Sequence, residues 1–151
     1  MPEPASVRKI AYALFAAAAI AAAGPVFALE VRGGDDARWV SGGIGEGERV
    51  DMLMLLPDYN LRVLTVAEKS GAYLAGAEVV VRDATGRVVL ETALDGPLLL
   101  ARLAPGRYEV QATYGGKAQT RALTIPASGR RELFLYWSVP GIETLPKGET
   151  Q

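Results

Sequence analysis

Apolar and polar residues alternate along most of the chain from Asn60 onward, and this two-residue period constrains the fold more than any other feature. Successive side chains of a β-strand point to opposite faces, so the period predicts strands with one buried and one solvated face. Turn-forming pairs such as Asp95-Gly96 and Pro105-Gly106 separate the strands at the spacing of about 8 to 12 residues that is typical of sandwiches. The expected strands are residues 61–68, 78–82, 88–92, 98–103, 107–114, 117–125 and 131–137. We therefore predict an all-β fold, a single seven-stranded antiparallel β-sandwich.

The hairpin centred on Gly115-Gly116 is the clearest local signal in the chain. Two successive glycines supply both positive-φ positions of a tight hairpin turn. Before them, Tyr108 and Val110 alternate with polar residues, and residues 117–125 can pair back. The alternation places the apolar set of this hairpin in the core.

Residues 46–56 show a helical period instead of a strand period. Acidic residues are concentrated in the first half, where they complement the helix dipole, and Pro57 ends the pattern. The residues that share one side of the helical wheel are Val50, Met52, Leu53, Leu55 and Leu56. We expect a short amphipathic helix over about 46–56, with an apolar side that covers part of the sandwich.

Composition divides the chain into four parts. Residues 1–28 read as an export signal, and 29–59 form an N-terminal extension that contains the helix. The first part of this extension, 29–45, is rich in Gly and charge and lacks a sustained period. Residues 60–137 form the sandwich, and 138–151, rich in Gly, Pro and charge, form a flexible C-terminal tail.

The N-terminus has the order of features that a signal peptidase recognises. Arg8 and Lys9 form a positive start, 10–23 is uncharged and almost wholly apolar, and small or aliphatic residues precede a cut between Ala28 and Leu29. A retained membrane anchor is the alternative, but a spanning helix needs about 20 apolar residues and this run is shorter and mostly Ala. We expect cleavage, no stable membrane insertion afterwards, and a periplasmic location, with secretion as the alternative. Without Cys at the cut, no lipid anchor is expected.

The chain contains no Cys and no His, which excludes thiol nucleophiles, His-based triads and the usual zinc ligand sets. Its 16 basic and 17 acidic residues form no basic block, so the electrostatic footprint of a nucleic-acid binder is missing. Asp35-Asp36 lacks the pattern of a calcium loop, and the Gly-rich residues 42–47 match no phosphate loop. No spacing singles out a pair of carboxylates. We predict no catalytic residues, no cofactor and no metal.

Three motifs in order resemble the carboxypeptidase regulatory-like domains, which belong with the transthyretin-like (prealbumin-like) sandwiches. They are Gly-Ala-Glu-Val-Val-Val at 76–81, an Asp-x-x-Gly turn at 83–86, and Leu-x-Pro-Gly-x-Tyr-x-Val at 103–110. The resemblance covers about residues 60–137 and implies a sandwich that serves as an accessory or surface module or as a small free-standing envelope protein, the last being the form expected here. The His residues of the hydroxyisourate hydrolases in this group are absent, and the only Asn, Asn60, does not fit the isopeptide bond of adhesin modules.

Aromatic residues are the best candidates for a binding surface. Phe134, Tyr136 and Trp137 lie on the last strand, Tyr59 precedes the first strand, and Tyr73 lies in a loop. Either both faces of the last strand are buried, one in the core and one beneath the helix, or one face is exposed to a partner. The two tyrosines either touch a ligand or plug the ends of the sandwich. These five residues are the candidate partner-binding residues.

The sequence thus favours a non-catalytic exported module that binds a protein or a component of the bacterial envelope. One alternative is a structural subunit that adds strands edge to edge with its neighbours. Another is a hydrolase that uses carboxylates and Tyr. Neither the identity of a partner nor the oligomeric state follows from the residues.

Overall fold

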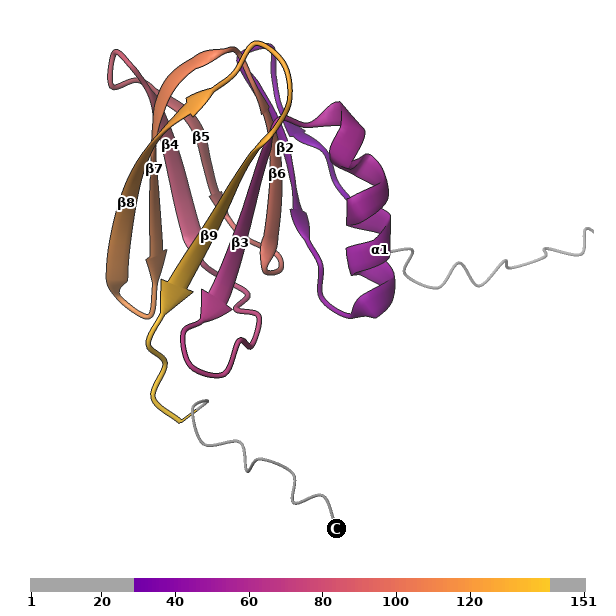
Figure 1. Ribbon diagram of the computed structural model, residues 1–151, viewed down its shortest axis with the longest axis vertical. Coiled ribbons are helices and arrows are strands. Elements are labelled where there is room, and N and C mark those ends of the chain that lie inside the picture. Colours follow the sequence, from indigo (N-terminus) through magenta and orange to yellow (C-terminus); the bar gives the residue numbers. More distant parts are fainter. Residues whose placement is uncertain (1–28, 142–151) are drawn as a thin grey trace, which may run out of the picture.

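Nine strands in two sheets, packed face to face, make up the computed structural model, which describes residues 29–141 (Figure 1). The five-stranded sheet has the order β1 (Arg32–Gly33), β2 (Ala37–Gly42), β6 (Leu98–Leu103), β3 (Leu61–Ala67) and β9 (Arg131–Trp137). The four-stranded sheet has the order β5 (Val88–Ala93), β4 (Glu78–Asp83), β7 (Gly106–Tyr114) and β8 (Lys117–Ile125). The helix α1 (Glu46–Leu55) continues into a 3₁₀ turn, η1 (Leu56–Asp58). The all-β sandwich is confirmed.

The predicted count of seven strands is wrong, because residues 29–45 contribute two more. β2 pairs with β6 over its whole length, and β1 pairs with β2. β2 escapes a search for alternation because its two faces are both largely buried: Ala37 lies in the core between the sheets and Val40 lies under α1. The segment assigned to an extension therefore forms the β1–β2 side of the five-stranded sheet.

The prediction of a wholly antiparallel fold also needs correction. β3 and β9 run parallel, in register from Leu61 opposite Arg131 to Ala67 opposite Trp137. A parallel pair needs a long crossover between its strands, and here almost the whole remaining sandwich provides it. All other strand pairs are antiparallel.

The main core lies between the sheets and comes from the inward-facing set of each strand. Tyr108 and Val110 belong to it, and Gly115 and Gly116 turn the β7–β8 hairpin with φ of 55° and 76°, as the alternation and the glycine pair predict. The largest side chains that are fully buried here are Leu61, Leu90, Leu99, Ile125 and Leu135.

A second apolar layer lies on the outer face of the five-stranded sheet, under α1. Met52 is completely buried there, and the remaining members of the layer are Val40, Tyr59, Leu64, Val66, Leu98 and Leu100. The helix stands beside β2 and β6, whereas β9 is at the far edge of the sheet (Figure 1). The predicted helix is confirmed, but it covers only part of this face.

Two predicted segments fall outside the described residues. The signal peptide, with Ala28 at its end, and the tail from residue 142 onward are not part of the described chain. Leu29, on the other side of the predicted cut, packs against the second apolar layer. Within residues 29–141, no helix has the length and hydrophobicity needed to cross a membrane.

Candidate binding surface

The outer face of β3 and β9 is apolar, and α1 leaves the β9 part of it open while the β3 residues belong to the buried second layer. Strand register places Leu64 beside Phe134 and Val66 beside Tyr136. Tyr73, in the loop after β3, forms a β-bridge with Val66 on the other side of that strand. Paired residues of neighbouring strands point to the same face, so these five side chains form one continuous surface, which we call the aromatic face.

The three rings of the aromatic face are exposed, whereas Leu64 and Val66 between them are buried. Tyr73, Phe134 and Tyr136 are 52%, 40% and 51% exposed. Together with Val50 and Leu53 of α1, they make up five of the nine large hydrophobic side chains that are exposed in the described part of the chain. The sheet thus covers only part of the apolar side of α1. Val50 and Leu53 of that side stay exposed and lie next to the aromatic face.

A groove of about 320 Å³ separates α1 from β3 and continues the aromatic face toward the helix. Its walls combine apolar side chains with charged ones at the rim. The lining residues are Glu46, Arg49, Val50, Leu53, Arg62, Leu64, Tyr73 and Leu98.

Two arginines lie over the rings of this surface. The Cζ of Arg49 is 5.3 Å from the centroid of the Tyr73 ring, and the Cζ of Arg62 is 5.7 Å from that of Phe134. Both distances fall within the range of cation–π attraction. Arg62 also forms an ion pair with Glu132 at 3.4 Å, yet its Nε is buried without a hydrogen-bond partner among the described residues. Aromatic rings with arginines are the composition of protein-binding hot spots.

The structure separates the five aromatic candidates into two groups. Tyr73, Phe134 and Tyr136 come together on the aromatic face, whereas Trp137 and Tyr59 are buried. Because β9 alternates, Trp137 faces the core, where it packs on the Tyr114 ring and donates from Nε1 to the carbonyl oxygen of Lys117 at 2.9 Å.

Tyr59 belongs to the layer beneath α1, and its burial raises the pKa of its hydroxyl. Neither Tyr59 nor Trp137 adds an exposed ring to the aromatic face. The idea that both faces of the last strand are buried is also wrong, since Phe134 and Tyr136 are exposed and α1 lies beside β2 and β6, away from the edge strand β9.

Sequence reasoning missed Arg49 and Arg62. Arg62 alternates with the inward-facing Leu61 and Val63 and therefore shares the outer face with Leu64, a position that the two-residue period does give. The period does not tell which outer residues the helix covers. That depends on where the helix packs.

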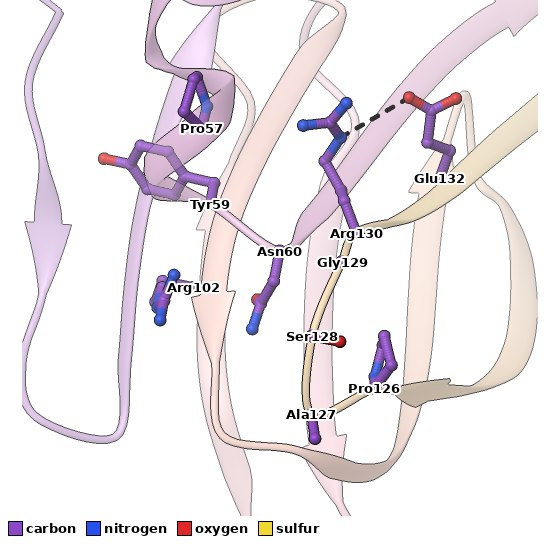
Figure 2. A pocket seen from close by; sticks show the side chains of 10 residues that line it. All are labelled: Pro57, Tyr59, Asn60, Arg102, Pro126, Ala127, Ser128, Gly129, Arg130 and Glu132. Carbon is purple, nitrogen blue, oxygen red and sulfur yellow. Dashed lines mark ion pairs between the residues drawn. The ribbon is translucent and has the colours of Figure 1, made fainter.

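A second, polar hollow of about 470 Å³ lies at the other end of the same sheet face (Figure 2). Figure 2 shows Arg102 and Tyr59 on one side and the loop between β8 and β9 on the other. The Arg130 guanidinium is 3.7 Å from Glu132. The lining residues are Pro57, Tyr59, Asn60, Arg102, Pro126, Ala127, Ser128, Gly129, Arg130 and Glu132.

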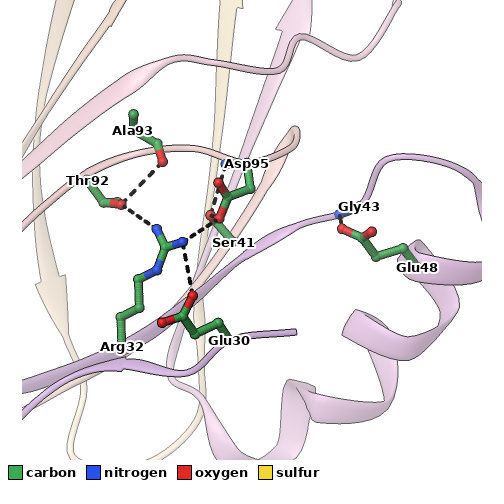
Figure 3. A network of polar contacts seen from close by, with 8 residues as sticks. All are labelled: Glu30, Arg32, Ser41, Gly43, Glu48, Thr92, Ala93 and Asp95. Carbon is green, nitrogen blue, oxygen red and sulfur yellow. Dashed lines mark hydrogen bonds and ion pairs between the residues drawn. The ribbon is translucent and has the colours of Figure 1, made fainter. Parts of the chain in front are cut away.

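A third hollow contains three acids, each of which has a structural partner (Figure 3). Arg32 contacts Asp95 at 3.1 Å and Glu30 at 3.5 Å, and Glu48 accepts a hydrogen bond from the Gly43 amide at 2.7 Å. These contacts tie the first strands to α1 and to the loop before β6. Across residues 29–141, no group of three or more acidic side chains is arranged to hold a metal ion.

The loop before β6 also approaches β2 very closely. A Cβ on Gly96 would lie 2.2 Å from the carbonyl oxygen of Gly42, so only glycine fits at this position. Ser41 reinforces the contact, because its hydroxyl donates to the Asp95 carboxylate at 3.1 Å and accepts from the Asp95 amide at 3.0 Å. Residues of the third hollow therefore hold β2 against the loop before β6.

No protein-family model matches the chain, and no curated protein is significantly similar to it.

Proposed function

We propose that the protein is an exported, non-catalytic β-sandwich module that binds a partner protein through the aromatic face. The observation that carries the proposal is the gathering of Tyr73, Phe134 and Tyr136, all exposed, beside two arginines. The signal-like N-terminus supports removal of residues 1–28 and work in the periplasm, or outside the cell. The resemblance to carboxypeptidase regulatory-like domains supports an accessory or free-standing envelope module of the prealbumin-like kind.

The character of the surface favours a polypeptide over a membrane or a small molecule. Arg49 and Arg62 are matched within the same surface by Glu46 and Glu132, so it lacks the basic excess that anionic lipids attract. The face is open, whereas small-molecule sites enclose most of the ligand. Exposed aromatic rings with balanced charges at the rim suit a partner with an apolar segment.

Edge-to-edge assembly is the less favoured alternative. Side chains already engage the outer edge of β9 and the neighbouring edge of β8: the Gln119 amide donates to the carbonyl oxygen of Tyr136, and Trp137 donates to that of Lys117. A strand added at β9 would have to displace the first of these contacts. A carboxylate-dependent hydrolase is less favoured because Glu30, Glu48 and Asp95 each have a structural partner.

Site-specific photo-crosslinking in an exporting host tests the proposal. A benzoylphenylalanine at position 73 or 136 should yield adducts with one and the same protein. The matched control is position 88, since Val88 is 44% exposed on the edge strand of the other sheet and should yield no such adduct. Equal labelling at all three positions, or no adduct at 73 and 136, contradicts the proposal, and an adduct between two copies of the chain favours the structural alternative.

The captured protein must then bind through the rings themselves. With the purified partner, Tyr136→Ala should weaken binding by at least about tenfold, as truncation of a hot-spot aromatic does. Val88→Ala should leave the affinity within about twofold, as surface residues outside an interface do. Unchanged binding by both Tyr73→Ala and Tyr136→Ala would assign the partner to another surface.

A further inference from the structure

Two arginines lie directly opposite each other in neighbouring strands, and one of them, Arg102, lines the polar hollow. Arg38 of β2 and Arg102 of β6 are register partners, and both side chains are exposed on the outer face of the five-stranded sheet. Neither guanidinium has an ion pair or a side-chain hydrogen bond to any residue in 29–141. Like charges in this position repel each other, and such pairs destabilise a sheet.

The surroundings add further positive charge and hydrogen-bond donors to the two arginines. Arg102 lines the hollow together with Arg130 and Ser128, and the Ser128 hydroxyl forms no hydrogen bond within the described residues. Burial raises the pKa of the Tyr59 hydroxyl, which also lies in the lining; the nearby Arg38 lowers that pKa and Asp58 raises it. The acid of the lining, Glu132, already contacts Arg62 and Arg130.

An oxyanion would relieve the repulsion. A guanidinium presents several N–H donors in a planar fork that matches the oxygens of a carboxylate or phosphate. Two arginines in register on one face suit a doubly charged group better than a single carboxylate, because the dianion neutralises both. The hollow of about 470 Å³ is larger than a phosphate and mostly polar in its lining, so the group attached to the anion would itself be hydrophilic.

We propose that Arg38 and Arg102 form an oxyanion site for a phosphate monoester, with the polar hollow receiving the hydrophilic group that carries the phosphate. Ser128 and Arg130 line the same hollow from the loop between β8 and β9 (Figure 2). The site lies at the opposite end of the sheet face from the aromatic face and does not depend on the proposed partner protein.

Titration of the protein purified from an exporting host tests the site. Inorganic phosphate, glucose 6-phosphate, sulfate and acetate are compared by calorimetry at constant ionic strength and about pH 8. The expected order is glucose 6-phosphate tighter than phosphate or sulfate, with acetate weakest. Arg102→Gln and Arg38→Gln should each weaken binding of glucose 6-phosphate by about tenfold or more, since each removes charge-assisted hydrogen bonds.

The matched control is Arg107→Gln, because Arg107 is exposed on β7 of the other sheet. It removes the same net charge and should leave the affinity unchanged. In phosphate-free buffer, Arg38→Gln and Arg102→Gln should melt at the wild-type temperature or above it, because each removes a repulsion. Phosphate should raise the melting temperature of the wild type and of Arg107→Gln, but not that of the other two variants.

Vesicles of phosphatidylcholine with phosphatidic acid distinguish a lipid headgroup from a soluble ligand. Binding of glucose 6-phosphate without retention on these vesicles supports a soluble ligand, whereas retention that Arg102→Gln abolishes supports the same site with a lipid phosphate. The proposal is overturned if none of these probes binds, or if Arg107→Gln loses as much affinity as Arg102→Gln.

Discussion

Asp83 shows how one partly exposed side chain can organise a turn. Its Oδ1 accepts hydrogen bonds from the amide and hydroxyl of Thr85, at 2.9 and 2.6 Å, and from the Arg87 amide at 3.1 Å. Its Oδ2 accepts from the Arg87 Nε at 3.3 Å. These bonds favour the ionised carboxyl, the Thr85 hydroxyl most strongly, and they hold the pKa of Asp83 below its usual 3.8. The β4–β5 connection is therefore most stable when Asp83 is charged.

We predict that Asp83→Ala lowers the free energy of unfolding at pH 7 and that this deficit shrinks in acid. A folded-state pKa below the unfolded value stabilises the fold above the unfolded pKa, and the stabilisation is lost as the pH falls through the folded pKa. Urea unfolding of wild type and variant at about pH 7 and about pH 3 measures the difference. Glu91→Ala, on the exposed side of β5, is the control and should change little at either pH. A deficit that stays constant from pH 7 to pH 3 would show that the charge of Asp83 does not matter.

Met52 is the buried residue of the helix α1, so substitutions in this helix test how it packs on the second apolar layer. Met52 is fully buried against the outer face of the sheet, whereas Met54 is 77% exposed on the same helix. We predict that Met52→Ala lowers the free energy of unfolding by about 2–5 kcal/mol through the cavity it leaves. Met54→Ala should stay within about 0.5 kcal/mol of wild type. Chemical unfolding followed by far-ultraviolet circular dichroism measures both, and equal effects would mean that α1 is not packed as described.

The sequence predicts a strand most clearly where one of its faces is more exposed than the other. β4, β7 and β9 alternate in burial in this way, so the two-residue period located them. β6 is buried on both faces, but the Asp95-Gly96 and Pro105-Gly106 turns mark its ends. β2 is buried on both faces, with Trp39 packed on the main core and Val40 under α1, and its pattern carries no alternation. The period also placed Phe134 and Tyr136 on one face. It could not place the edge of α1 relative to β9, and that edge decides whether the two rings are exposed.

The parallel pairing of β3 with β9 joins distant parts of the chain. β7 and β8, in contrast, are adjacent in sequence and joined by the Gly115-Gly116 turn. Contacts between distant residues require closure of a long loop, so folds dominated by them fold in about milliseconds to seconds. We expect the hairpin to form early and β9 to dock late.

Stopped-flow refolding of two matched core variants tests this order. Val110 of β7 and Leu135 of β9 are both fully buried. Val110→Ala should mainly slow folding, whereas Leu135→Ala should mainly accelerate unfolding, because interactions absent from the transition state affect the unfolding rate. Microsecond refolding of the wild type, or a slower folding phase only in Leu135→Ala, would contradict late docking of β9.

The β3–β9 pair has a consequence for a polypeptide that passes through a secretion channel N-terminus first. β3 would emerge early with one edge unpaired, and its partner would follow only after residues 68–130 had crossed. The sandwich could not close while its last strand was still inside the channel. Under the proposed export route, the β3–β9 pair could therefore form in full only after residue 137 had reached the far side of the membrane.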